Sequence, residues 1–188
     1  MAHVLIVNSS LRKNSNSNEL SARVAEGARG SGHQVFVIDI SRKHIKPCHA
    51  CESCIQPKAK GCVLKDDMQE FYPLIREANC IIFVSPIYWF TMGGQIKQFI
   101  DRCYAVAVPP GHEGPSPFAQ KKLGAVLVYG DEDPFASGCV NAIRTFQDIS
   151  AYTGAEWAGC LYGSAYETGE ITQNPVLLEK ALQYGASL

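Results

Sequence analysis

The chain has 188 residues, of which 46% are hydrophobic and 19% charged, and its formal net charge at pH 7 is −1. This size and apolar fraction predict a single globular domain over residues 1–188 rather than two domains. A net charge near zero gives no bulk attraction to nucleic acid or to an anionic membrane, so neither is expected as a partner. Residues 1–10 lack the regions of a secretion signal, and no apolar run is long enough to span a bilayer, so we expect a cytoplasmic protein.

Five apolar runs alternate with amphipathic runs along the chain. Several of them are apolar almost throughout, as strands buried on both faces of a parallel sheet must be. The predicted strands are 3–7 (HVLIV), 34–40 (QVFVIDI), 80–87 (CIIFVSPI), 122–130 (KLGAVLVYG) and 156–163 (EWAGCLYG). The predicted helices are 18–32, 66–78, 93–106, 137–154 and 175–186. This alternation predicts an open α/β sheet with right-handed crossovers, in which ligands bind at the carboxyl ends of the strands.

A polar loop, NSSLRKNSNSNEL (8–20), follows the first predicted strand and leads into a helix. Backbone N–H groups at a helix N-terminus favour an anion, and the serine hydroxyls together with Arg12 and Lys13 add donors and positive charge. The loop therefore predicts a site for a phosphate monoester. The alternative is an ordinary polar loop in which Asn16 and Glu19 form a capping box. The loop contains neither the P-loop motif nor the dinucleotide-binding glycine motif.

Four of the eight cysteines lie in CHACESCIQPKAKGC (48–62), within a cysteine-rich loop over residues 46–64. In a reducing compartment, clustered cysteines favour metal binding or redox chemistry over disulfide bonds. The other four cysteines lie within apolar strand or helix patterns and are expected to be small core residues. These four are Cys80, Cys103, Cys139 and Cys160.

Three consecutive aromatic residues follow the third predicted strand in SPIYWFTMGGQIKQFIDR (85–102). Pro86 is expected to end the strand, which places Tyr88, Trp89 and Phe90 at the ligand-binding edge of the sheet. Aromatic side chains there indicate a site for a flat ring, and the alternative is that they fold back onto the core.

These segments, with CVLKDDM (62–68) between them, resemble the NAD(P)H-dependent FMN reductase family of flavodoxin-like flavoproteins. The resemblance implies a three-layer α/β sandwich in which a five-stranded parallel sheet, in the order 2-1-3-4-5, carries helices on both faces. One departure is that the family's first loop commonly opens Gly-Ser-Pro-Arg, whereas residues 9–12 here are Ser-Ser-Leu-Arg, which changes the stiffness of the loop.

The resemblance also implies where FMN binds. The phosphate would lie in the first loop, the ring along the segment after the third strand, and the far side of the ring against YGDEDPFASG (129–138). The implied cofactor-binding residues are Ser10, Arg12, Ser15, Asn16, Ser17, Pro86, Ile87, Tyr88, Trp89, Phe90, Thr91, Tyr129, Gly130 and Asp131.

The iron–sulfur flavoprotein branch of this family has a cysteine motif that matches Cys48, Cys51, Cys54 and Cys62 in spacing and position. The resemblance implies a single [4Fe–4S] cluster, since three cysteines two residues apart can wrap three corners of the cube. Two alternatives remain. Zinc also takes four cysteines, usually as two separated pairs, and thiols that bind no metal would be packing or redox-sensing residues.

The predicted function is that of an FMN-dependent oxidoreductase that takes electrons from NAD(P)H and passes them to an acceptor, with the [4Fe–4S] cluster as a one-electron relay where it is present. No side-chain acid or base is expected to be catalytic. The alternative is a flavin and iron–sulfur electron carrier between protein partners such as ferredoxin, and a further alternative is a regulator without a redox cofactor. Relatives place flavin sites near subunit contacts, so we expect a homodimer or homotetramer.

Overall fold

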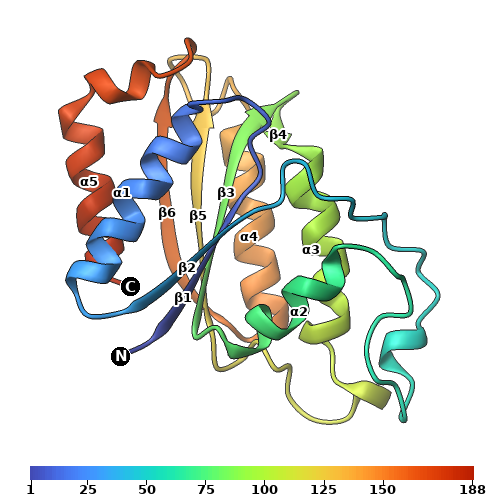
Figure 1. Cartoon of the computed structure of the whole chain (residues 1–188). Helices are drawn as coiled ribbons and strands as arrows, with labels where there is room; N and C mark the ends of the chain where they lie inside the picture. Colours follow the sequence, from blue (N-terminus) through green and yellow to red (C-terminus); the bar gives the residue numbers. More distant parts are fainter.

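A sheet forms the middle layer of the chain, and helices pack on both of its faces (Figure 1). The computed structural model describes residues 1–188. The strands are β1 (His3–Asn8), β2 (Gln34–Asp39), β3 (Cys80–Tyr88), β4 (Thr91–Met92), β5 (Lys122–Tyr129) and β6 (Glu156–Ser164). The helices are α1 (Asn16–Gly30), α2 (Met68–Glu77), α3 (Gly94–Ala107), α4 (Cys139–Thr153) and α5 (Pro175–Ala186), with short 3-10 helices η1 (Ser53–Ile55), η2 (Pro110–His112) and η3 (Glu170–Gln173). None of the helices is long and apolar enough to cross a membrane.

The five long strands run parallel in the order β2-β1-β3-β5-β6. Numbered as the five predicted strands, this is the order 2-1-3-4-5, so the predicted fold class is confirmed. Strand β4 is an additional strand of two residues that pairs antiparallel with the end of β3.

Strand β3 ends at Tyr88, one residue beyond the predicted range 80–87. The expectation that Pro86 ends the strand is wrong, because Pro86 remains in register with Val128 of β5 and the strand continues to Tyr88. Beyond Pro86 the partner changes, and Tyr88 pairs with Thr91 of β4. The segment predicted as a loop is therefore the end of a strand, a tight turn and a return strand.

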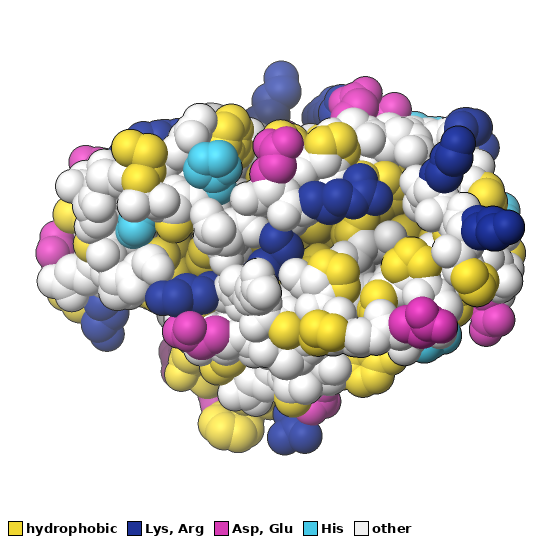
Figure 2. Space-filling model, turned by 90° about the horizontal axis from the view of Figure 1, so that it is seen from below, with side chains coloured by type: hydrophobic (Ala, Val, Ile, Leu, Met, Phe, Trp, Pro, Cys, Tyr) yellow, Lys and Arg dark blue, Asp and Glu magenta, His cyan; other side chains and the backbone are white.

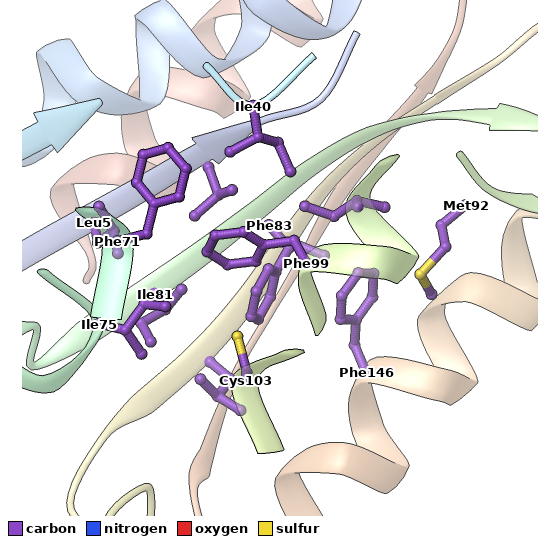
Figure 3. Close-up of a cluster of buried hydrophobic side chains, with 14 of the residues drawn as sticks. Leu5, Ile40, Phe71, Ile75, Ile81, Phe83, Met92, Phe99, Cys103 and Phe146 are labelled. Carbon is purple, nitrogen blue, oxygen red and sulfur yellow. The ribbon is translucent and has the colours of Figure 1, made fainter. Parts of the chain in front are cut away.

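Alternating residues of the strands belong to two separate hydrophobic cores, one on each face of the sheet. In β1, Leu5 and Val7 pack under α2, α3 and α4, whereas Val4 and Ile6 pack under α1 and α5. Figure 3 shows the first of these cores, where Phe83 stacks on Phe146 with ring centroids 5.2 Å apart. Both faces of the sheet are covered, which explains why the strand sequences are nearly continuous apolar runs.

The four cysteines outside the cysteine-rich loop pack as predicted. Cys80, Cys103 and Cys139 are buried and Cys160 is half-buried. Burial raises the pKa of the Cys80 and Cys139 thiols to about 12, so both stay protonated and unreactive near neutral pH.

Candidate functional site

Two adjoining cavities, of about 220 and 170 Å³, lie at the carboxyl ends of the strands, at the top of Figure 1. The larger is lined by Ser10, Arg12, Ser15, Asn16, Ser17, Pro86, Ile87, Tyr88, Val128, Tyr129, Gly130, Ala165 and Tyr166. The smaller is lined by Ile87, Trp89, Phe90, Tyr129, Gly130, Asp131 and Ser137. The structure thus brings together every residue that the sequence analysis assigned to the cofactor except Thr91, whose backbone pairs with Tyr88 in the β3–β4 hairpin.

The polar end of the larger cavity is built on the first turn of α1. Ser15 is the N-cap of this helix, and its hydroxyl accepts a hydrogen bond from the backbone N–H of Asn18 at 3.2 Å. The cap is therefore Ser15 rather than the Asn16 of the capping-box alternative. Ser10 and Ser17 are also buried here, while Arg12 is exposed at the rim. The first N–H groups of a helix have no partner within the helix, so they and these side chains can hold an anion.

Asn16 does not present a free side chain to this cavity. Its amide donates to the carbonyl oxygen of Glu167 at 2.8 Å and accepts from the N–H of Ile171 at 3.1 Å. The side chain therefore ties the start of α1 to the segment around η3. Ser17 makes no comparable hydrogen bond through its hydroxyl and is the better candidate for a direct contact with a ligand.

The segment after β6 adds a wall to the cavity that the sequence analysis missed. Ala165 and Tyr166 line it, and an ideal Cβ on Gly130 would lie 3.1 Å from the Tyr166 ring. This segment could have been expected at the site from its position alone, because it follows a parallel strand and all parallel strands of the sheet end at this edge. Burial raises the pKa of the neighbouring Tyr129 phenol, so its hydroxyl remains a hydrogen-bond donor near neutral pH.

The aromatic end of the site is the turn between β3 and β4. Trp89 and Phe90 both have left-handed backbone conformations, with φ of 49° and 68°. The carbonyl oxygen of Phe90 accepts a hydrogen bond from the side-chain amide of Asn141 at 3.0 Å, and Gly138 packs directly against the Phe90 backbone. The turn is thereby fixed to the start of α4, while the Trp89 side chain remains 91% exposed.

The arrangement suits a flat molecule with an anionic tail. Hydroxyls, Arg12 and free helical N–H groups gather at one end, and the polar backbone of the β3–β4 turn and Tyr129 lie at the other. FMN has this shape and charge distribution, so the residues present fit it.

The four clustered cysteines line a separate and larger cavity of about 660 Å³. Cys48 and Cys51 are exposed, Cys54 and Cys62 are half-buried, and none of the four forms a disulfide. The remaining wall comes mainly from α3 and α4 and is mostly apolar, with residues such as Tyr104. Figure 2 shows the molecule from below, where hydrophobic side chains lie inside a hollow on the side of the cysteine-rich loop and lysine and arginine side chains lie on its rim.

The backbone between the cysteines is unusual. Ala50 and Glu52 have φ of 50° and 56°, a conformation that costs a non-glycine residue roughly 1–2 kcal/mol. Successive N–H groups in alternating right- and left-handed conformations form concavities that bind anions, iron–sulfur clusters among them. A hydrogen bond from Ser53 lowers the pKa of Cys51, whereas burial, followed by the proximity of Cys62, raises the pKa of Cys54. This donor set and backbone fit an anionic cluster held by thiolates.

The two sites lie at opposite ends of α3 (Figure 1). The helix begins beside the β3–β4 turn, and its last two turns, from Ile100 to Ala107, face the cysteine cavity. A helix of 14 residues is about 21 Å long. One rigid element therefore connects the two sites.

A family model described as NADPH-dependent FMN reductase matches residues 2–147. An iron–sulfur flavoprotein of Archaeoglobus fulgidus is 35% identical over 118 residues, which cover 62% of this chain and 49% of that protein. An iron–sulfur flavoprotein of Methanocaldococcus jannaschii is 34% identical over 118 residues, covering 63% of this chain and 56% of the other. The match thus spans about half the length of these curated relatives.

Among solved structures, an NAD(P)H:quinone oxidoreductase from Methanothermobacter marburgensis is similar in fold. Its TM-score is 0.74 at 19% sequence identity, with 98% of this chain and 96% of that chain covered.

Proposed function

The chain belongs to the NADPH-dependent FMN reductase family, and on this premise we propose that it is an oxidoreductase that binds FMN at the carboxyl edge of its sheet and transfers electrons from NAD(P)H to an acceptor. The observation that carries the proposal is the continuous site between the first turn of α1 and the β3–β4 turn. Bound FMN would supply the hydride and electron chemistry.

The chain's own residues bind and orient this cofactor. The phosphate would be held at the polar end, where the free N–H groups of α1 and the side chains of Ser10, Arg12 and Ser17 each offer a donor or a positive charge. The backbone from Ile87 to Phe90, at the other end of the site, would offer its polar groups to the ring. No side chain has to move a proton for a hydride transfer, so binding and orientation are the protein's contribution.

The proposal is tested by titrating the apoprotein with FMN and then mixing the complex anaerobically with NADPH or NADH. We expect FMN to bind at micromolar concentration or tighter and its visible absorption to bleach on addition of a nicotinamide. Riboflavin, which lacks the phosphate, is the control ligand and should bind more weakly. Equal affinity for FMN and riboflavin would contradict the phosphate site, and an unbleached complex would contradict the reductase.

We further propose that Cys48, Cys51, Cys54 and Cys62 hold a [4Fe–4S] cluster. Four unpaired cysteines around one cavity support this, as does the left-handed backbone between them. As the side chains stand in this structure, no three cysteine, histidine or acidic side chains are placed to hold a metal ion. Iron and sulfide analysis of protein purified without oxygen separates the three cases of cluster, zinc and free thiols.

The electron-carrier alternative rests on the same cysteines. A carrier would be reduced by a protein such as ferredoxin and would oxidise NAD(P)H only slowly. Steady-state oxidation of NAD(P)H with a small-molecule acceptor favours the enzyme, whereas reduction by ferredoxin alone favours the carrier.

Assembly and location are part of the proposal. The exposed aromatic side chains near the flavin site, Trp89, Phe135 and Tyr166, suit burial in a homodimer or homotetramer, which light scattering would detect. A monomeric mass would exclude this assembly. Unpaired clustered thiols persist in the reducing cytoplasm, where we place the protein, and cell fractionation would show a different location.

A further inference from the structure

Arg102 of α3 is buried, with 2% of its surface exposed, and its guanidinium contacts both ends of the cysteine-rich loop. One nitrogen, Nη1, donates to the carbonyl oxygen of Lys46 at 2.9 Å and to Oδ2 of Asp66 at 2.5 Å. The other, Nη2, donates to the Sγ atom of Cys62 at 3.4 Å, to Oδ1 of Asp66 at 3.2 Å and to the hydroxyl of Tyr72 at 3.3 Å.

Asp66 holds this guanidinium in place and also fastens the loop. Its Oδ2 atom accepts the backbone N–H of Lys46 at 2.9 Å, and its Oδ1 atom accepts the N–H of Met68 at 3.2 Å. The Arg102–Asp66 pair therefore joins the two ends of the cysteine-rich loop: Lys46 precedes the first of its cysteines, and Asp66 follows the last.

Stability alone does not explain such a pair. Burying two charges carries a large desolvation penalty, and apolar replacement of a buried pair is often neutral or stabilising. The Nε atom of Arg102 is also buried without a partner, which adds to the penalty. A neutral side chain of similar length would avoid both penalties. The positive charge at position 102 therefore needs an explanation other than stability.

We propose that Arg102 is a positioning residue for the fourth cluster ligand, and that its hydrogen bond to Cys62 sets the reduction potential of the cluster. This inference rests on the proposed cluster at the four cysteines. The guanidinium donates to the sulfur that would ligate the cluster and so orients it, and hydrogen bonds to the sulfurs together with local charge tune the potential of such a cluster. Reduction adds negative charge to the cluster and its ligands, so a hydrogen bond donated to the Cys62 sulfur stabilises the reduced form more than the oxidised form. The net charge of Arg102 contributes little, because Asp66 balances it.

The decisive variant is Arg102→Met combined with Asp66→Asn. It removes both charges together, so no unpaired charge is left buried, and the introduced asparagine side chain would retain one oxygen to accept a backbone N–H. The control is Arg23→Met with Glu26→Gln, which removes the exposed ion pair of α1, formed at 2.7 Å. Arg102→Lys is the second variant, because lysine keeps the positive charge but cannot span all of these partners.

The proteins are reconstituted with iron and sulfide, and the cluster is reduced by one electron with dithionite in a potentiometric titration followed by electron paramagnetic resonance. FMN affinity, measured at the other end of α3, reports whether the fold is intact. We expect the double variant to keep its FMN affinity and to have a more negative midpoint potential. At the midpoint potential of the wild type, the loss of a charge-assisted hydrogen bond should lower the ratio of reduced to oxidised cluster in the double variant about tenfold.

The lysine variant should show a smaller shift in the same direction, together with an altered resonance spectrum, and the surface control should show neither. Loss of the cluster from the double variant with FMN affinity intact would also support the positioning role. An unchanged potential and spectrum in both Arg102 variants would overturn it. If the double variant does not fold, the lysine variant decides alone. A wild-type protein that takes up no cluster would instead overturn the proposed metal site, and this inference with it.

Discussion

Replacing Gly138 with alanine tests whether the β3–β4 turn is held against α4. Gly138 has a φ of 77°, and an ideal Cβ there would lie 2.3 Å from the carbonyl oxygen of Phe90 and 2.5 Å from its Cα. Both are backbone atoms, so rotation of a side chain cannot relieve the contact. To restore ordinary van der Waals separation, the turn that carries Trp89 and Phe90 must move by about 1 Å.

Two terms contribute to the expected loss of stability. A left-handed alanine costs roughly 1–2 kcal/mol relative to glycine, and overpacking adds roughly 1–3 kcal/mol. Gly32→Ala is the matched control, because Gly32 has a φ of 82° but no atom within 4 Å of an ideal Cβ. The control therefore includes only the first term, at the opposite edge of the sheet.

Urea unfolding of both variants measures the free energies, and quenching of FMN fluorescence measures the affinity for the cofactor. We expect Gly138→Ala to be the less stable of the two and to bind FMN at least about tenfold more weakly, since a displacement of 1 Å at a binding surface has effects of this size or larger. Gly32→Ala should bind FMN as the wild type does. The reasoning is wrong if the two variants match in both stability and affinity.

Three further predictions concern Arg12, Trp89 and Asp66. Arg12→Glu should weaken FMN binding about three- to tenfold at low salt and leave riboflavin binding unchanged, whereas Lys13→Glu, outside the cavity wall, should have little effect in the same fluorescence titration. Trp89→Gly should raise the free energy of unfolding by about 1 kcal/mol, and the melting temperature by about 2–4 °C in calorimetry, because it relieves a left-handed residue whose side chain packs on little. Burial alone would raise the pKa of Asp66, but the hydrogen bonds from Arg102 and from backbone N–H groups outweigh it and lower that pKa below 3.8. The stability from this group is thus present above about pH 4 and lost as the pH falls through the folded pKa, so urea unfolding between pH 5 and 2 should show a steeper loss in the wild type than in the Asp66→Asn, Arg102→Met variant.

The fold could be predicted from the sequence because burial on both faces leaves a visible pattern. The run HVLIV places alternate residues in two different cores, and each side needs an apolar residue, so the strand is apolar throughout. The order of the strands is not visible in such runs. It came from the family resemblance and is confirmed by the register of the parallel pairs.

The parts of the site that could not be predicted depend on partners far along the chain. Asn16 reads as a ligand-binding side chain, yet its amide is occupied by residues 151 and 155 positions away. Arg102 was not singled out in the sequence, because its partners Asp66 and Cys62 lie 36 and 40 positions before it. Local pattern carries no information about such contacts, because they form only once the layers have packed.

Strained backbone is concentrated at the two sites, independently of any sequence motif. Six non-glycine residues have positive φ, and five of them lie in the three segments that build the two sites: Asn14, Ala50, Glu52, Trp89 and Phe90. Each such residue costs of order 1–3 kcal/mol, and glycine would avoid most of it.

The case of Trp89 is the clearest of these. The Trp89 side chain is 91% exposed, and its ring contacts mainly Phe90, with centroids 5.8 Å apart. Packing of the indole within the chain therefore offsets little of the free-energy cost of the strained backbone. An exposed indole also leaves a large apolar surface in water, which is unfavourable in an isolated chain. The two-residue hairpin itself requires positive φ at both turn residues, and the exposed indole is the part that contacts within the chain leave without a partner. A bound ring, or a second subunit that covers the turn, would remove this apolar surface from water. Nuclear magnetic resonance of the Trp89 indole N–H would separate the two: a change on dilution of the FMN-free protein indicates the subunit contact, and a change on addition of FMN at one protein concentration indicates the bound ring. A resonance that changes in neither experiment would contradict both.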